Sequence, residues 1–118
     1  MKLENFSYRL WDKSARCFMY ADTDKYLALA SYKDLEIELY TGLKDKKGKK
    51  IYDGDILEVI YYYNKELLAE VIFKDFAFRV KVFNKNLREI DTLILKDTLF
   101  ASIKVVGNIH ENDLKDFK

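Results

Sequence analysis

The chain has 118 residues and a mass of 14.0 kDa, with 49% hydrophobic, 15% aromatic and 35% charged residues. That length predicts one domain, the apolar content excludes wholesale disorder, and no apolar run approaches the roughly 20 residues that cross a bilayer. With 21 basic and 20 acidic side chains, the net charge of +1 excludes an overall electric field that would draw the protein to nucleic acid.

In the first half of the chain, alternating apolar and polar residues predict three strands. Residues 6–11 and 17–20 form an expected hairpin, and residues 35–40 form a strand with one apolar and one charged face. Residues 21–31 fit either a short helix or a strand. A polar loop over residues 41–50, which holds two of the four glycines, is expected to end this half.

The second half predicts a denser succession of strands. The expected strands and turns are, in order, 56–63, a turn after it, 68–73, a turn at 74–75, 76–83, a turn at 84–86, and 103–109. Residues 87–102 fit a further strand or a helical turn, and residues 111–118 fit a polar tail or a terminal helical turn. Four or five short strands in about 60 residues indicate a small antiparallel barrel. We therefore expect a mainly β fold, with an N-terminal β-hairpin lobe (residues 1–50) packed on a barrel (residues 51–118) as one compact unit.

Trp11, the only tryptophan, is expected to anchor the N-terminal hairpin to the barrel. Arg9 lies two positions earlier on the same strand face, so its guanidinium is placed to stack on the indole ring.

The expected loop over residues 41–50 concentrates positive charge. Five lysines less Asp45 give it a local charge of +4, and these lysines are Lys44, Lys46, Lys47, Lys49 and Lys50. One interpretation is a solvated loop. The other is a loop that contacts phosphate, because lysines neutralise phosphates without reading bases. A nucleic-acid partner is the less favoured of the two, since the arginines are scattered along the sequence.

Three consecutive tyrosines, Tyr61, Tyr62 and Tyr63, put aromatic rings on both faces of one predicted strand. Either these rings are divided between the core and the boundary with the N-terminal lobe, or they form an exposed platform that stacks bases or binds protein. Self-association is favoured over base stacking, because Tyr is enriched at interfaces and a net charge near zero does not oppose contact. We expect the three tyrosines and the five lysines to be the contact residues.

Side chains with catalytic or metal-binding chemistry are scarce. Asp55 is expected to cap the amides of the turn at Gly54. The alternative is that Asp53 and Asp55 act as a pair of metal ligands or acid–base carboxylates, but no third ligand lies nearby. The single cysteine, Cys17, is expected to be buried, and the single histidine, His110, to lie at the surface where a strand ends. We therefore expect no enzymatic activity, no cofactor and no metal.

Three stretches of the chain resemble one protein family. Residues 8–12 and 19–20 read YRLWD and MY, residues 39–56 read LYTGLKDKKGKKIYDGDI, and residues 105–112 read VVGNIHEN. In this order and spacing they resemble the YopX-like proteins of bacteriophages and prophages. The resemblance implies an SH3-like barrel in the second half and phage-derived ancestry. It implies no established biochemical activity. Because the composition is that of a cytosolic globular domain, we expect the protein in the cytoplasm of a bacterial host.

The sequence departs from the family pattern at a few positions. One is Phe76, which stands where a Gly often closes the hairpin turn. The other departures are Leu39 for Gln, Lys47 for Asn and Asp113 for Pro. Leu39 removes a polar side chain. The expected function is a non-enzymatic oligomerising or partner-binding module, whose partner is itself or another phage or host protein and not a membrane. The alternative is a nucleic-acid-binding barrel that uses the lysines from residue 44 to residue 50.

Overall fold

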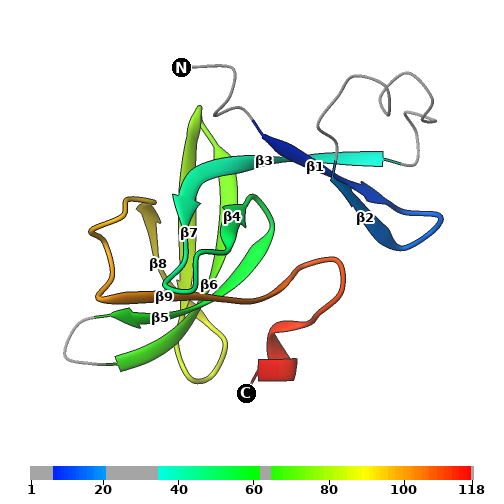
Figure 1. Ribbon diagram of the computed structural model, residues 1–118. Coiled ribbons are helices and arrows are strands. Elements are labelled where there is room, and N and C mark those ends of the chain that lie inside the picture. Colours follow the sequence, from blue (N-terminus) through cyan, green and yellow to red (C-terminus); the bar gives the residue numbers. More distant parts are fainter. Residues whose placement is uncertain (1–6, 21–34, 62–64, 118) are drawn as a thin grey trace.

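The computed structural model describes residues 7–20, 35–61 and 65–117, which form two antiparallel β-sheets (Figure 1). The strands are β1 (Tyr8–Asp12), β2 (Cys17–Tyr20), β3 (Leu35–Lys44), β4 (Lys50–Tyr52), β5 (Asp55–Tyr61), β6 (Lys65–Lys74), β7 (Ala77–Phe83), β8 (Glu89–Ile94) and β9 (Ser102–Asn108), and a 3-10 helix, η3 (Leu114–Phe117), follows them. Within the described ranges, no helix has the length and apolarity needed to cross a membrane. Residues 21–31, which left two interpretations open, lie outside the described residues.

The first sheet has the strand order β2-β1-β3-β4 and contains the expected N-terminal hairpin. The Asp12 carboxylate accepts the backbone N–H groups of Ser14 and Ala15, which closes the turn between β1 and β2. Strand β1 pairs on its other side with β3, where Arg9 lies opposite Glu38. Two charged residues thus face each other across one strand pair.

Strand β3 is longer than predicted and links the two parts of the molecule. It continues through Lys44, so the prediction of a loop from residue 41 is wrong for its first four residues. The register with β4 shifts between Tyr40 and Lys44, at the point where Gly42 has a φ of 88° and the Thr41 hydroxyl donates to the Ile51 carbonyl. This irregularity bends the strand without ending it. Figure 1 shows β3 leaving the N-terminal sheet and curving over the second one.

The second sheet, β8-β7-β6-β5-β9, curls into a half-barrel and carries the main hydrophobic core. Alternate residues of neighbouring strands face inward and are fully buried, as in the pairs Val71 with Val80 and Ala69 with Val82. The ambiguous segment 87–102 contributes β8 and then turns. The expected mainly β fold, with a curled sheet in the C-terminal half and a hairpin lobe at the N-terminus, is therefore confirmed.

Candidate functional site

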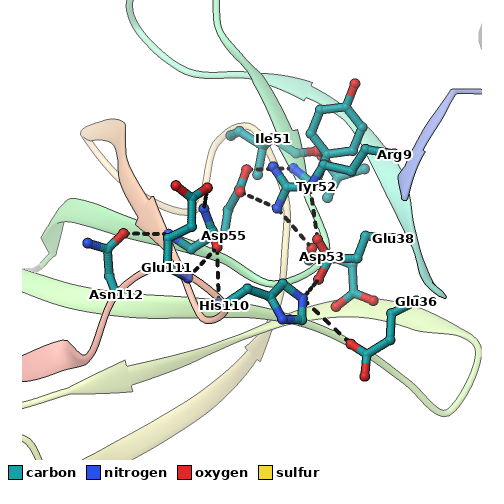
Figure 2. Close-up of polar contacts among 12 residues, drawn as sticks. Arg9, Glu36, Glu38, Ile51, Tyr52, Asp53, Asp55, His110, Glu111 and Asn112 are labelled. Atoms are coloured by element: carbon teal, nitrogen blue, oxygen red, sulfur yellow. Dashed lines mark hydrogen bonds and ion pairs between the residues drawn. The ribbon is translucent and has the colours of Figure 1, made fainter. Parts of the chain in front are cut away.

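A buried ionic cluster lies where the two sheets meet (Figure 2). Arg9 of β1 donates from Nε to Glu38 Oε1 at 2.9 Å and from Nη2 to Asp55 Oδ1 at 2.7 Å. These three side chains are at most 6% exposed. One guanidinium thus joins β1 and β3 of the first sheet to β5 of the second.

Aromatic rings enclose the Arg9 guanidinium on two sides. Its central carbon lies 4.2 Å from the ring centroid of Phe18 and 4.7 Å from that of Tyr52. The expected stacking on Trp11 is therefore wrong, because Phe18 of β2 and Tyr52 of β4 take that place. Burial alone would lower the pKa of Arg9, but Asp55 and Glu38 raise it above its ordinary value.

The Asp55 carboxylate uses both of its oxygens. Oδ1 accepts from Arg9, and Oδ2 accepts the backbone N–H of Tyr52 at 2.8 Å, so the predicted capping of the Gly54 turn is confirmed. Burial raises the pKa of Asp55, while the Arg9 guanidinium and the Tyr52 N–H oppose that rise. Gly54 itself has a φ of 88°, and a Cβ at this position would overlap the Glu38 carboxylate. Glycine is required here for both reasons.

His110 joins this cluster from the C-terminal side. Its Nε2 lies 2.9 Å from Glu38 Oε2, and its ring stacks on Trp11 with centroids 4.7 Å apart and an interplanar angle of 12°. The side chain is only 11% exposed, so the expectation of a surface histidine is wrong. The cause is the turn after β9, where the Asn108 side chain accepts the N–H groups of His110 and Glu111 and directs the histidine back toward β3. The expected anchoring role of Trp11 operates through this stack.

Asp53 lies beside the cluster and does not form a metal-binding pair with Asp55. Burial and the charge of Glu38 raise its pKa to about 6. Because Asp55 is already bonded to Arg9 and Tyr52, the two carboxylates do not form an open chelating pair. Among the described residues, no group of three or more His, Cys, Asp and Glu side chains could hold a metal ion.

The three sequence motifs meet in this cluster. Arg9 and Trp11 come from the first motif, Asp55 from the second, and His110 from the third. The polar atoms that hold them together bond to one another rather than pointing to solvent. The cluster therefore acts as a structural joint between the sheets. Sequence reasoning missed Glu38, which looked like part of a solvated face and is in fact the partner of both Arg9 and His110.

The predicted lysine contact residues lie on the turn between β3 and β4 and at the adjoining ends of those two strands. Asp45 is buried, and its carboxylate accepts the backbone N–H groups of Lys47, Lys49 and Val105. The N–H of Lys46 also donates to the Ile103 carbonyl, so the turn is fixed against β9. The side chains of all five predicted lysines remain exposed. All five fall within residues 44–50, so their proximity follows from the sequence itself.

The predicted tyrosine contact residues are described only in part. Tyr61 is half-buried, packs on Phe100 with ring centroids 5.6 Å apart, and donates its hydroxyl to Asp91. Tyr62 and Tyr63 lie outside the described residues. Cys17, which was expected to be buried, is exposed at the start of β2.

The most exposed aromatic side chain in the described part of the protein is one that no prediction assigned to a site. Phe76, at the turn between β6 and β7, is 98% exposed. Asp75 and Phe76 have φ values of 52° and 60°, the pattern of a type I′ turn, in which Asn and Gly are preferred. Next to the turn, the half-exposed Phe73 packs on Phe78 with ring centroids 5.0 Å apart. In the sequence, this exposed side chain is indicated by the presence of Phe76 where the family usually has Gly.

An apolar groove of about 400 Å³ lies at the other end of β7. Five apolar side chains supply much of its wall: Leu67, Leu68, Phe83, Leu87 and Phe117. Charged side chains line it as well, and these are Glu58, Glu66 and Lys85. The groove thus lies between the turn after β7 and the C-terminal helix η3, away from the ionic cluster.

Fold and site together define a small two-sheet β-protein whose sheets are joined by a buried ionic cluster. The family model for the YopX protein matches residues 15–115, and the chain belongs to the YopX family. It is similar in fold to the YopX protein from Bacillus subtilis, with 22% identity, a TM-score of 0.63, and coverage of 92% of this chain and 95% of that chain. Protein EF1440 from Enterococcus faecalis is also similar, with 20% identity, a TM-score of 0.61, and coverage of 91% and 94%. No protein of curated function matches the chain significantly. The sequence-based family prediction is thus confirmed.

Proposed function

We propose that this protein is a non-enzymatic binding module of phage or prophage origin, which acts in the bacterial cytoplasm by associating with protein surfaces, its own included. Family membership supports the origin, because the motifs resemble those of phage and prophage proteins. The conformation and exposure of Phe76 support the binding function.

Phe76 combines two unfavourable properties. A non-glycine side chain in the left-handed region costs about 1 kcal/mol relative to the right-handed one, and this residue has a φ of 60°. It also leaves a whole aromatic ring in water, where burial in a partner would gain about 2 kcal/mol. Exposed aromatic anchors and strained backbones are both typical of contact sites. Phe76 is therefore the observation on which the proposed function depends.

The arrangement of ionisable groups favours binding over catalysis. Arg9, Glu38, Asp55 and His110 are bonded to one another inside the molecule. The apolar groove, in contrast, is lined by apolar residues, an amide and three charged side chains, with no His, Ser or Cys. A nucleophile and its base are thus missing from this groove, which suits it to binding an apolar side chain.

Light scattering across protein concentrations, from low micromolar to near millimolar, tests the proposal. The wild-type protein should associate as concentration rises, or should retain a partner in a pull-down from host cells that a Phe76→Asn bait fails to retain. Asparagine accepts left-handed backbone, so this variant removes the ring and keeps the turn. A strict monomer with identical pull-downs for both baits would contradict the proposed function.

A second candidate function, nucleic-acid binding, is favoured by the five exposed lysines on the β3–β4 turn and at the strand ends beside it. Replacing Lys46, Lys47, Lys49 and Lys50 by Glu should abolish such binding and leave protein association in place. Negligible affinity for DNA and RNA at about 50 mM salt would exclude this candidate, because phosphate contacts are strongest at low salt.

A further inference from the structure

We infer that the apolar groove beside η3 receives the Phe76 tip of a second copy of this chain, so that copies associate head to tail. This inference rests on the proposed binding function and names both the partner and the receiving site. It follows from three features of the described residues: the size of the groove, its position relative to the tip, and the charges around both.

The groove has the size and lining that an aromatic side chain needs. Its volume of about 400 Å³ lies within the range of pockets that hold small-molecule ligands, so it has room for an aromatic ring. Leu68 and Phe83 face each other across the β6–β7 pair and form its floor, and Leu87 and Phe117 come from the turn and the helix beside it. A phenyl ring that enters would be surrounded by apolar carbon on several sides.

The tip cannot fill the groove of its own chain. Phe76 precedes β7, whereas Phe83 and Leu87 lie at its far end, so the length of β7, about 20 Å, separates the two sites. Figure 1 shows the yellow-green β6–β7 turn at one end of the sheet and the yellow turn near the red C-terminal helix at the other. The contact is therefore between molecules.

The charges around the tip and the groove are complementary. Lys74 and Asp75 precede Phe76, and both are exposed. The groove carries Glu58, Glu66 and Lys85, so it offers two carboxylates to the lysine of the tip and one ammonium to its aspartate. Complementary charge favours this partner over a strongly acidic or strongly basic one.

A contact between two different surfaces of the same chain leaves one tip and one groove free at the ends of every open assembly. Such heterologous contacts produce rings or open chains rather than closed dimers. One hairpin tip in one groove buries little surface, so we expect weak association that increases continuously with concentration.

Two matched variants test the inference. Phe76→Asn removes the tip ring, and Leu87→Asn removes one wall of the groove. Both residues have a φ of 60°, and asparagine tolerates left-handed backbone, so both variants should fold, which circular dichroism checks. Each variant alone should associate at least about tenfold more weakly than the wild type.

A one-to-one mixture of the two variants should form a heterodimer, because the Leu87→Asn chain supplies a tip and the Phe76→Asn chain supplies a groove. Light scattering and sedimentation should show a dimer and nothing larger. If the mixture stays monomeric, or if Leu87→Asn associates like the wild type, the groove is not the receiving site and the inference is wrong, although Phe76 keeps its binding role. A wild-type protein that stays monomeric throughout overturns the inference, and Phe76-dependent capture of another protein would leave the proposed function standing.

Discussion

Two residues of this protein occupy positions that their surroundings disfavour. Phe76 has a left-handed backbone conformation and an aromatic ring exposed to water. The Asp53 carboxylate is half-buried and lies close to the negative charge of Glu38. Neither arrangement stabilises the folded chain. Each therefore gives a substitution that should increase stability, which is uncommon for single changes.

The substitution Phe76→Gly should stabilise the protein by about 0.5–1 kcal/mol. Glycine adopts left-handed φ without a steric cost, and the sequence Asp-Gly is preferred in type I′ turns. Urea unfolding should show a higher midpoint with an unchanged slope. The matched control is Ala77→Gly in β7, which should lower stability by a similar amount because the backbone there is already relaxed. A lower midpoint for Phe76→Gly would contradict the assigned strain.

The substitution Asp53→Asn should change the pH dependence of stability. The pKa of Asp53 is raised from 3.8 to about 6, first by burial and then by Glu38, so the folded state binds the proton more tightly than the unfolded state does. The protonated Asp53 side chain therefore stabilises the folded state relative to the ionised one. This stabilisation is complete below about pH 4 and is lost as pH rises through about 6. The variant should therefore gain about 1 kcal/mol over the wild type between about pH 4 and pH 7, a figure that allows for screening of the half-exposed side chain. Urea titrations across this range check it, and a difference that does not vary with pH would show that the buried Asp53 carboxylate is not the group that titrates.

Among the elements, the turn between β3 and β4 depends on a single carboxylate. Burial would raise the pKa of Asp45, but the N–H groups of Val105, Lys49 and Lys47, together with the charge of Lys49, lower it below its ordinary value. Three backbone donors thus share one side chain, and one of them belongs to β9. The lysine turn is held to the half-barrel by this contact.

The substitution Asp45→Ala should cost about 2–3 kcal/mol, because it leaves the buried N–H of Val105 and the half-buried N–H groups of Lys47 and Lys49 without their acceptor. Hydrogen exchange should quicken at the amides of Lys47, Lys49 and Val105 before it does so elsewhere in the sheet. The control Lys46→Ala removes an exposed side chain from the same turn and should change stability by less than about 0.5 kcal/mol. Equal exchange rates in the Asp45 variant and the wild type would show that the turn is held by something else.

Local patterns in the sequence predicted much of the fold and little of the site. Period-two alternation placed most strands, and Asp55 capped its turn as expected because donor and acceptor are three residues apart. The partners of Arg9 are 29 and 46 residues away, and Glu38 meets His110 across 72 residues. Such contacts depend on strand register and sheet curvature, which short-range patterns do not encode. The extension of β3 was missed for a related reason: Gly42 signals a turn, but in this strand it forms a bulge.

At the scale of the whole molecule, the ionic cluster decides whether the two sheets behave as one unit. A buried ion pair contributes little net stability, because desolvation of the charges offsets their attraction, yet removal of one partner is costly. Arg9 bonds both to Glu38 of the first sheet and to Asp55 of the second. Trp11, the only tryptophan, stacks on His110, so its fluorescence reports this joint specifically.

The substitution Arg9→Met should cost about 3–5 kcal/mol, because Glu38 and Asp55 would remain buried after losing the guanidinium that they share. In the wild type, unfolding followed by Trp11 fluorescence and by circular dichroism should have one midpoint, as expected of a single compact unit. In the variant, the fluorescence change should come at lower urea, since the joint opens before the half-barrel core of β5, β6 and β7 unfolds. The control Lys13→Met removes an exposed cation that lies 3.1 Å from Glu36, and it should change stability by less than about 0.5 kcal/mol. Coincident midpoints in the Arg9 variant, with a loss below about 1 kcal/mol, would mean that packing alone joins the sheets.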